Sequence, residues 1–380
     1  MSVAKRRVPR AEQVGSLKRS QRLIAANEAI YVPGHVALED AERERGLDQL
    51  YAVAEEESRR VVQRQLDIGL DVVTDGEFRR YMFLNSLFDG ITGFSSEVSK
   101  AKFKAADGSV IEWNMQYVVD RLVQVDSPAT REAAFMSTVT DRLYKVTFPA
   151  GSFLALPYNY KPEINGHAYE SHRALVEHVV AIEKRMIADV VAAGCRYVQL
   201  DFPVYPFLCD PDWRGRMERH GYDWQETLDL AVWADREVVA GLPDHVRTGI
   251  HVCRGNNQSR HVAEGALDPV AGALFSLPYD SFLIEWEDKA RMGDYSALSH
   301  LPPGDSVVVL GLVSSKRAAM ESQDDLLREL DRASAHVDPD RLALSPQCGF
   351  ASTLKGNLVT EDDQWRKLEL VVETARRFWS

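Results

Sequence analysis

The sequence predicts an α/β fold: a single TIM (β/α)8 barrel with an insertion after its second strand. Three observations predict this fold. Eight short apolar runs rich in β-branched residues recur along the chain, stretches of helical period separate them, and no Gly-x-Gly-x-x-Gly motif follows the first run. This alternation favours a closed parallel barrel over an open doubly wound sheet. A chain of 380 residues is long enough for one such barrel, so we expect a single domain over 1–380.

The expected strands are spread over the whole chain. They are 12–16, 70–74, 144–148, 196–200, 247–252, 281–285, 306–312 and 341–345. Apolar residues at helical spacing predict a helix over 47–68, between the first two strands, and another over 175–190. The same spacing over 365–379, behind the possible cap Thr360, predicts the last barrel helix.

The stretch 78–143 is too long for one strand-to-helix connection. Its middle, 100–114, mixes glycine and charge with little periodicity. We therefore expect 78–143 to be an insertion that caps the barrel mouth. No internal repeat or low-complexity linker divides the chain.

The composition excludes several classes of protein. A hydrophobic fraction of 45%, with 27% charged residues, excludes wholesale disorder. The 45 basic and 57 acidic side chains leave a net charge of −12, so we expect no nucleic-acid partner. No apolar run approaches the roughly 18 residues of a membrane span, so we expect no membrane partner and a cytoplasmic protein. Four cysteines are too few for a disulfide framework, so a cysteine that does chemistry is expected to act as a thiolate.

Polar residues gather at the C-terminal ends of the expected strands, where a barrel of this kind places its active site. They are Gly15-Ser16, Asp75-Gly76-Glu77, Gly151-Ser152, Asp201, His251 with Cys253, Glu285, Ser314-Ser315-Lys316 and Cys348-Gly349. We expect all of them to face one mouth of the barrel.

Four of these residues have the chemistry of metal ligands. His251 and Cys253 are two apart at a strand end, so both side chains point to the same side. Glu285 and Cys348 close two further strands, and the four groups can converge on a tetrahedral ion such as Zn²⁺. Glu287 shares the side of Glu285 and competes with it for this role. Buried free cysteines are commonly apolar filler, which is the interpretation we favour for the other two, Cys195 and Cys209.

The donor set indicates the chemistry. Two thiolates and a carboxylate over-neutralise Zn²⁺, which makes the ion a poor Lewis acid for water and disfavours hydrolysis. Such an ion still binds an incoming thiol, lowers its pKa and leaves enough charge on sulfur for attack on carbon. The donor set therefore favours thiol alkylation.

At this point the residues resemble a known family, the catalytic barrel of cobalamin-independent methionine synthase and its shorter single-barrel relatives. The matching pieces are Val14-Gly15-Ser16, Asp75-Gly76-Glu77, Val198-Gln199-Leu200-Asp201, His251-Val252-Cys253-Arg254-Gly255-Asn256, Glu285, Gly311-Leu312-Val313-Ser314-Ser315-Lys316 and Pro346-Gln347-Cys348-Gly349. The similarity runs across nearly the whole chain. The ordered set is specific, although each piece alone is not.

The resemblance implies both a metal site and a substrate site. It implies that zinc is bound by His251, Cys253, Glu285 and Cys348 and activates a thiol such as homocysteine. It also implies that Ser16, Glu77 and Asp201 hold the amino and carboxylate ends of an amino-acid thiol, which suits the charges involved. The alternative for the two carboxylates is a structural ion pair with one of the neighbouring arginines, Arg79, Arg80 or Arg254.

The chain departs from the family's pattern in three places. Larger synthases carry a second N-terminal barrel that helps to bind folate, whereas this chain begins at the catalytic barrel, so folate use does not follow from the resemblance. Phe202-Pro203 stands where those enzymes have Glu-Pro after the binding aspartate, which predicts a more apolar pocket. Ser314-Ser315-Lys316 stands where they place a histidine thought to protonate the leaving group. The candidate acids are Glu77, Lys316, Tyr158 and Tyr160.

We therefore predict a zinc-dependent S-alkyltransferase that activates a small thiol as a zinc thiolate, with methyl transfer to homocysteine or a similar thiol favoured. The first alternative is a zinc-dependent lyase that adds a thiol to an epoxide, as in the related epoxyalkane:coenzyme M transferase, where Arg79, Arg80 or Arg254 would hold a sulfonate. The second is a zinc-free barrel of decarboxylase type, in which the cysteines are incidental. The sequence identifies neither the thiol, the alkyl donor nor the oligomeric state.

Overall fold

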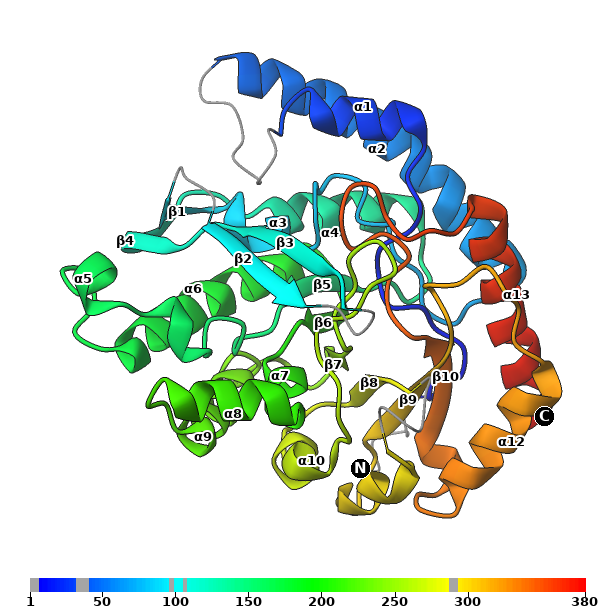
Figure 1. Cartoon of the computed structure of the whole chain (residues 1–380). Coiled ribbons are helices and arrows are strands. Elements are labelled where there is room, and N and C mark those ends of the chain that lie inside the picture. The colour runs from blue at the N-terminus through cyan, green and yellow to red at the C-terminus, as the bar shows by residue number, and fades with distance from the viewer. Residues whose placement is uncertain (1–6, 32–40, 96–98, 105–107, 287–292) are drawn as a thin grey trace.

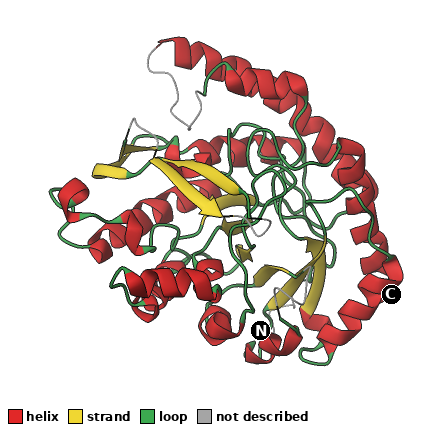
Figure 2. Ribbon diagram, in the orientation of Figure 1, coloured by secondary structure: helices red, strands yellow, loops and turns green. Residues whose placement is uncertain are grey.

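The molecule is built around a parallel sheet of six strands. The structure is a computed structural model, and it describes residues 7–31, 41–95, 99–104, 108–286 and 293–380. The strand order is β10-β9-β8-β7-β6-β5, and every neighbouring pair is parallel. The strands are β5 (Val146–Pro149), β6 (Tyr197–Asp201), β7 (Arg247–Val252), β8 (Ser281–Glu285), β9 (Val307–Val313) and β10 (Leu342–Pro346). These confirm the last six expected strands to within two residues at either end. Figure 2 shows the strands in the interior and the helices outside them.

The first two expected strands are wrong as strands, because 70–74 contains only a single bridge and the bridge nearest to 12–16 is at Ala11, one residue before it. Ala11 pairs with Leu344 of β10, and Val73 pairs with Tyr144 just before β5. Asp71 N donates to Ala11 O at 2.9 Å, so the two segments join each other as well. They thereby span the space between the two edge strands of the sheet.

Side chains explain why these two segments do not form longer ladders. Thr74 N donates to the side-chain oxygen Oε1 of Gln65, and Gly15 O accepts from Thr74 Oγ1. Val14 O accepts from Gln199 Nε2 at 2.8 Å. Backbone groups that are satisfied by side chains cannot also pair with a neighbouring strand. Extended segments can therefore occupy strand positions without strand hydrogen bonding.

Helices follow the strands and cover the sheet from outside (Figure 1). They are α1 (Gln21–Glu28), α2 (Ala41–Ile68), α5 (Pro162–Asn165), α6 (His172–Ala192), α7 (Tyr205–Cys209), α8 (Pro211–Arg219), α9 (Trp224–Glu237), α10 (Asp268–Phe275), α12 (Gln323–Ser334) and α13 (Glu361–Phe378). The three helices predicted from periodicity correspond to α2, α6 and α13. Thr360 caps α13 as expected, since its hydroxyl accepts from Asp363 N in a capping box. No helix in the described part of the chain is long and apolar enough to cross a membrane.

The stretch 78–143 folds into two antiparallel strand pairs between two helices. Its elements are α3 (Asn85–Phe88), β1 (Ile91–Phe94), β2 (Ser99–Lys104), β3 (Val110–Met115), β4 (Val118–Gln124) and α4 (Pro128–Val139). β1 pairs with β4, and β2 pairs with β3. β2 and β3 lie between β1 and β4 in the sequence. The described residues in the weakly periodic middle of the stretch thus belong to two paired antiparallel strands (Figure 1). That this insertion covers the barrel mouth stays a prediction.

Alternation along the strands separates the core from the site. Phe282 and Ile284 of β8 pack in the main hydrophobic core, whereas Leu283 packs in a small second cluster with residues of β9 and β10. Because side chains alternate along a strand, Glu285 lies on the same face as Leu283, one step nearer the C-terminal end. The face that is apolar at one end therefore presents polar groups at the other.

Candidate active site

Three potential metal ligands converge at the C-terminal ends of the strands. One ligand atom each from His251, Cys253 and Cys348 lies within 4.8 Å of the others, and all three residues are buried. His251 Nδ1 lies 3.2 Å from Leu283 O, a carbonyl that can only accept, so Nδ1 carries the hydrogen. The other ring nitrogen, Nε2, is buried without a partner. An unpaired imidazole nitrogen next to two sulfur atoms fits a metal ion.

Local backbone geometry sets the position of Cys253. Gly255 has a φ of +87°, and its N–H donates to Cys253 Sγ at 3.3 Å. A Cβ at Gly255 would lie 2.6 Å from Val262 Cγ2. Only glycine adopts this conformation in this space without strain. The Gly after Cys-Arg in the motif therefore serves to direct an N–H at the thiolate.

Cys348 is brought to the site by contact between the two ends of the chain. Phe350 N donates to Ser16 O at 2.8 Å, and a Cβ at Gly349 would lie 2.1 Å from Ser16 Oγ. The absence of a side chain at Gly349 thus allows the loop after β10 to lie directly on Ser16. This close approach places Ser16 and Cys348 in the same site.

The two thiols affect each other's pKa in opposite directions. A hydrogen bond from Cys348 lowers the pKa of Cys253, and the same hydrogen bond raises the pKa of Cys348 well above its ordinary value. Two adjacent buried sulfur atoms cannot both ionise unless a positive charge compensates them. A divalent cation would supply that charge, which is a second respect in which the residues fit a metal ion.

Glu285 lies beside this group but is held by other partners. Its Oε1 accepts from Lys316 Nζ at 2.6 Å, and its Oε2 accepts from Arg254 N at 2.9 Å. Burial alone would raise the pKa of Glu285, but Lys316 outweighs this effect and lowers it. Glu285 is not within the 4.8 Å group, so its role as the fourth ligand stays a prediction. Its competitor Glu287 lies outside the described residues.

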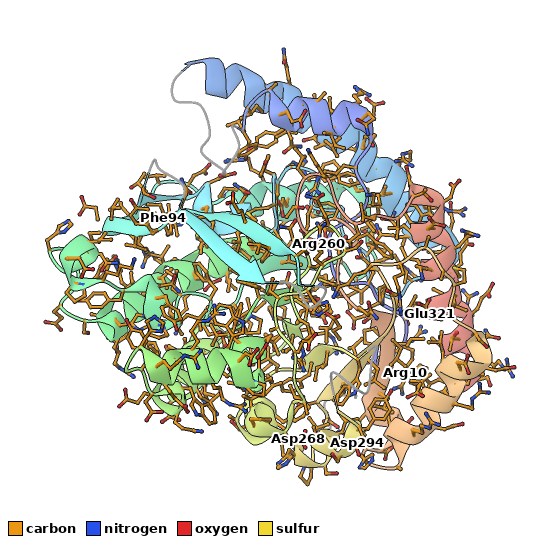
Figure 3. All side chains as sticks on the ribbon, viewed as in Figure 1. Arg10, Phe94, Arg260, Asp268, Asp294 and Glu321 are labelled. Carbon is orange, nitrogen blue, oxygen red and sulfur yellow. The ribbon has the colours of Figure 1, made fainter. Side chains whose placement is uncertain are left out.

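Lys316 is held in place by the loop that follows β9. Ser314 N donates to Glu321 Oε1 at 3.0 Å, and Lys367 of α13 donates to Glu321 Oε2 at 2.9 Å. Figure 3 labels Glu321 on the side of the molecule that faces α13. Burial alone would lower the pKa of Lys316, but Glu285 and Cys348 raise it. Lys316 therefore carries its positive charge into the site.

A small pocket with a volume of about 30 Å³ adjoins the ligand group. It is lined by Ser16, Glu77, Phe83, Asp201, Phe202, His251, Cys253, Asn256 and Ser352. The structure thus brings all three residues expected to bind substrate to one pocket with two of the expected ligands.

The two carboxylates of this pocket, Glu77 and Asp201, differ in their partners. Glu77 Oε1 accepts from Thr147 Oγ1 at 2.8 Å, whereas Glu77 Oε2 is buried without a partner. Asp201 Oδ1 accepts from Gln199 Nε2 at 2.8 Å. Burial, together with the charge on Glu77, raises the pKa of Asp201 to about 7. Two buried carboxyl groups at one pocket complement a cationic ligand group.

Of the three arginines considered as anion-binding groups, Arg79 and Arg80 are held by carboxylates, whereas Arg254 has one hydrogen bond from Nη2 and leaves Nε and Nη1 buried without a partner. Arg80 donates to both oxygens of Glu132, and Arg79 forms ion pairs with Glu55 and Asp75. Arg254 donates to Gly265 O at 2.9 Å. None of the three is among the residues that line the pocket. Arg80 Nη1 also lies 4.0 Å from Glu77 Oε1. The structural ion pair considered as the alternative role of Glu77 is therefore present as a long contact.

Two of the candidate acids lie away from this pocket. Tyr160 donates to Tyr169 O at 3.0 Å, and the ring of Tyr158 packs edge-on against Tyr222. Neither residue is among those that line the pocket beside Cys253. Of the four candidates, the structure brings Glu77 and Lys316 to the site.

Three pocket residues received no role from the sequence: Phe83, Asn256 and Ser352. Asn256 lies in the matched motif, three residues after the predicted ligand Cys253, and this position could have predicted that it lies near the site. Phe83 lies near the start of the insertion, and Ser352 follows Cys348 by four residues, so tertiary contact alone places them. Cys195 and Cys209, expected as filler, are buried and lie outside the metal-ligand group.

A parallel α/β sheet with an imidazole, two thiols and two carboxylates at the C-terminal ends of its strands defines an enzyme built around a metal-binding group. The family described as cobalamin-independent synthase, catalytic domain, matches residues 159–376. The chain belongs to this family, whose enzymes use zinc.

Relatives extend the similarity over the rest of the chain. An uncharacterized protein of Bacillus subtilis, YxjG, is 33% identical over 97% of this chain and 94% of its own length. The 5-methyltetrahydropteroyltriglutamate–homocysteine methyltransferase of Bacillus licheniformis is 24% identical over 80% of this chain but only 36% of that longer protein. A solved B12-independent methionine synthase from Shewanella sp. W3-18-1, in complex with selenomethionine, superposes with a TM-score of 0.72 over 98% of both chains at 17% identity.

Proposed function

We propose that this enzyme is a zinc-dependent S-alkyltransferase that transfers a methyl group to homocysteine or a similar amino-acid thiol. The observation that carries the proposal is the buried group of His251, Cys253 and Cys348, with an unpaired imidazole nitrogen next to two sulfur atoms. When bound, zinc would lower the pKa of an incoming thiol so that the thiol reacts as a thiolate.

The pocket beside this group supports an amino-acid thiol as the acceptor. Glu77 Oε2 is buried without a partner, and Asp201 lines the same pocket. We assign these carboxyl groups to the ammonium group of the substrate, and Ser16 to its carboxylate end. The selenomethionine held by the Shewanella protein is the selenium analogue of the product expected from such a thiol.

The leaving group requires a proton or a compensating charge. Lys316 Nζ lies within the site, 2.6 Å from Glu285 Oε1, and its pKa is raised by that neighbour. Glu77 is the other candidate acid at the pocket. We therefore assign the acid to Lys316 or Glu77 and give Tyr158 and Tyr160 no part in the reaction.

The second candidate is the addition of a thiol to an epoxide. The aromatic side chains of Phe83 and Phe202, with ring centroids 5.7 Å apart, form an apolar part of the pocket wall that suits an alkyl epoxide. A sulfonate-bearing thiol such as coenzyme M needs a cation in the pocket, and none of the arginines considered for this role lines it. Methyl transfer to an amino-acid thiol is therefore favoured.

The proposal is tested by metal analysis and a product search on the full chain. We expect one zinc ion per chain after mild purification, and formation of a thioether from homocysteine with one of several methyl donors. Parallel reactions contain epoxides with coenzyme M. A chain without stoichiometric zinc, whose activity is insensitive to chelator, would overturn the proposal in favour of the zinc-free barrel. Thioether formation from an epoxide without methyl transfer would favour the second candidate.

A further inference from the structure

The sulfur of Cys348 has a neighbour that the proposed reaction does not use. Ser352 Oγ lies 3.8 Å from Cys348 Sγ, within the range of a hydrogen bond to sulfur, and both residues are buried. Ser352 follows Cys348 by four residues, which is the spacing of one helical turn. The segment is a loop and not a helix, so other contacts must hold the Ser352 hydroxyl near the sulfur.

Three backbone contacts hold Ser352 in place. Arg19 donates to the carbonyl oxygens of Ala351 and Thr353, at 2.8 and 3.2 Å. Phe83 N donates to Ser352 O at 3.2 Å. The residues on both sides of Ser352 are thus attached to a buried guanidinium, and Ser352 itself is attached to the start of the insertion. The position of the hydroxyl relative to Cys348 is therefore built into the fold.

Asn256 determines which way the Ser352 hydroxyl points. Asn256 Nδ2 donates to Gly349 O at 2.8 Å and to Ser352 Oγ at 3.1 Å. Gly349 O can only accept, which requires the amide nitrogen of Asn256 on this side. Ser352 Oγ therefore accepts from Asn256, and its own hydrogen is directed to another acceptor. A metal-bound Cys348 has no hydrogen to donate, so its sulfur is the acceptor.

We propose that Asn256 and Ser352 form a hydrogen-bond relay that delivers the Ser352 hydroxyl hydrogen to Cys348 Sγ and limits the charge this sulfur donates to a bound metal ion. The inference rests on the proposed metal site and deepens it. The Gly255 N–H performs the same task for Cys253 at 3.3 Å. Each sulfur thus has one donor, and groups around the direct ligands tune the electron density at a metal in this way. Asn256 and Ser352 are positioning residues rather than catalytic ones.

The relay is tested by loading the full chain with Co²⁺ in place of zinc and recording the sulfur-to-cobalt charge-transfer absorption without substrate. Ser352→Ala removes the donor, so we expect the absorption to move to longer wavelength. Ser352→Thr keeps the hydroxyl and is expected to keep the position of the band. The matched control is Ser345→Ala, which removes a buried hydroxyl on β10 that donates to Pro346 O instead.

Asn256→Asp tests the direction of the relay. A carboxylate cannot donate to Ser352, and it would take the hydroxyl hydrogen away from Cys348. We expect the same shift as for Ser352→Ala, and no further shift in the double variant. An unchanged band in Ser352→Ala, or additive shifts in the double variant, would overturn the relay while leaving the metal site in place. A chain that gives no sulfur-to-cobalt band at all would overturn the metal site and the relay together.

Discussion

Lys316 Nζ donates to Glu285 Oε1 at 2.6 Å, and both side chains are buried at the ends of neighbouring strands. The pair includes Glu285, the residue that the sequence predicts as the fourth metal ligand. Glu285 has a lysine as its partner in the structure, and its role as a ligand beside the group of one imidazole and two sulfur atoms stays a prediction.

Removal of the lysine should destabilise the fold. Lys316→Met leaves the Glu285 carboxylate buried with the backbone N–H of Arg254 as its remaining donor. Breaking a buried ion pair from one side costs about 3–5 kcal/mol. We expect a loss of that order in the free energy of unfolding, measured with urea in the presence of chelator. Glu285→Gln in the same chain should recover part of the loss, and the exposed Lys161→Met serves as the control.

Cys348→Ser should remove most of the bound zinc and the thiol reaction while the fold is kept. The hydroxyl of serine is a poor ligand at neutral pH, because it does not ionise as a thiol does. Metal content per chain and the far-ultraviolet circular dichroism spectrum provide the measurements. The control is Cys195→Ser, another buried cysteine, whose sulfur donates to Tyr197 O outside the site. Full metal content in Cys348→Ser would contradict the ligand assignment.

Glu77→Gln should discriminate between two thiols. The variant replaces an unpartnered carboxylate oxygen in the pocket, so it removes a charge-assisted hydrogen bond to a substrate ammonium group. Such a bond contributes about 1.5–3 kcal/mol, which corresponds to a roughly 10- to 100-fold rise in KM for homocysteine. The KM for the matched thiol without an amino group should stay the same. An equal rise for both thiols would show that Glu77 does not contact the ammonium group.

The buried carboxyl of Asp235 on α9 should make stability depend on pH. Burial raises its pKa to about 6 from an ordinary value of 3.8. Between these values the folded protein keeps a proton that the unfolded chain has lost, so stability falls as pH rises from about 4 to 6. A shift of this size corresponds to about 3 kcal/mol. Asp235→Asn should flatten this part of the curve of unfolding free energy against pH.

The exposed Asp229 lies on the same helix and offers a matched control. Asp229→Asn should leave the slope between pH 4 and 6 as it is in the unaltered protein. An unchanged slope in Asp235→Asn would mean that the carboxyl is ionised in the folded protein at these pH values.

The sequence predicted the fold well where the hydrophobic pattern decides the structure. β7 and β8 have the predicted bounds, and every residue of both strands is buried, as is typical of strands in a parallel sheet covered by helices. The first two strands were overestimated because their backbone groups are satisfied by side chains from distant residues, such as Gln199 to Val14. No local pattern reveals that competition.

The candidate site was likewise predicted from the sequence only in part. The period of a strand placed His251 and Cys253 on one side, and the position of Cys348 at another strand end predicted its convergence with them. The acids Tyr158 and Tyr160 were candidates because they follow a strand, but loops can leave a sheet in many directions. Their separation from the pocket could not be derived from spacing.

By itself, the sequence determined which residues carry sulfur and imidazole and that they lie at the C-terminal ends of strands, because alternation and burial are local properties of a strand. Only the tertiary structure decided what surrounds these groups: Lys316 on Glu285, Asn256 on Ser352, and Ser352 on Cys348. These contacts join loops that are far apart in the chain, and their hydrogen bonds depend on distances and directions that are set only when the sheet and its helices pack together.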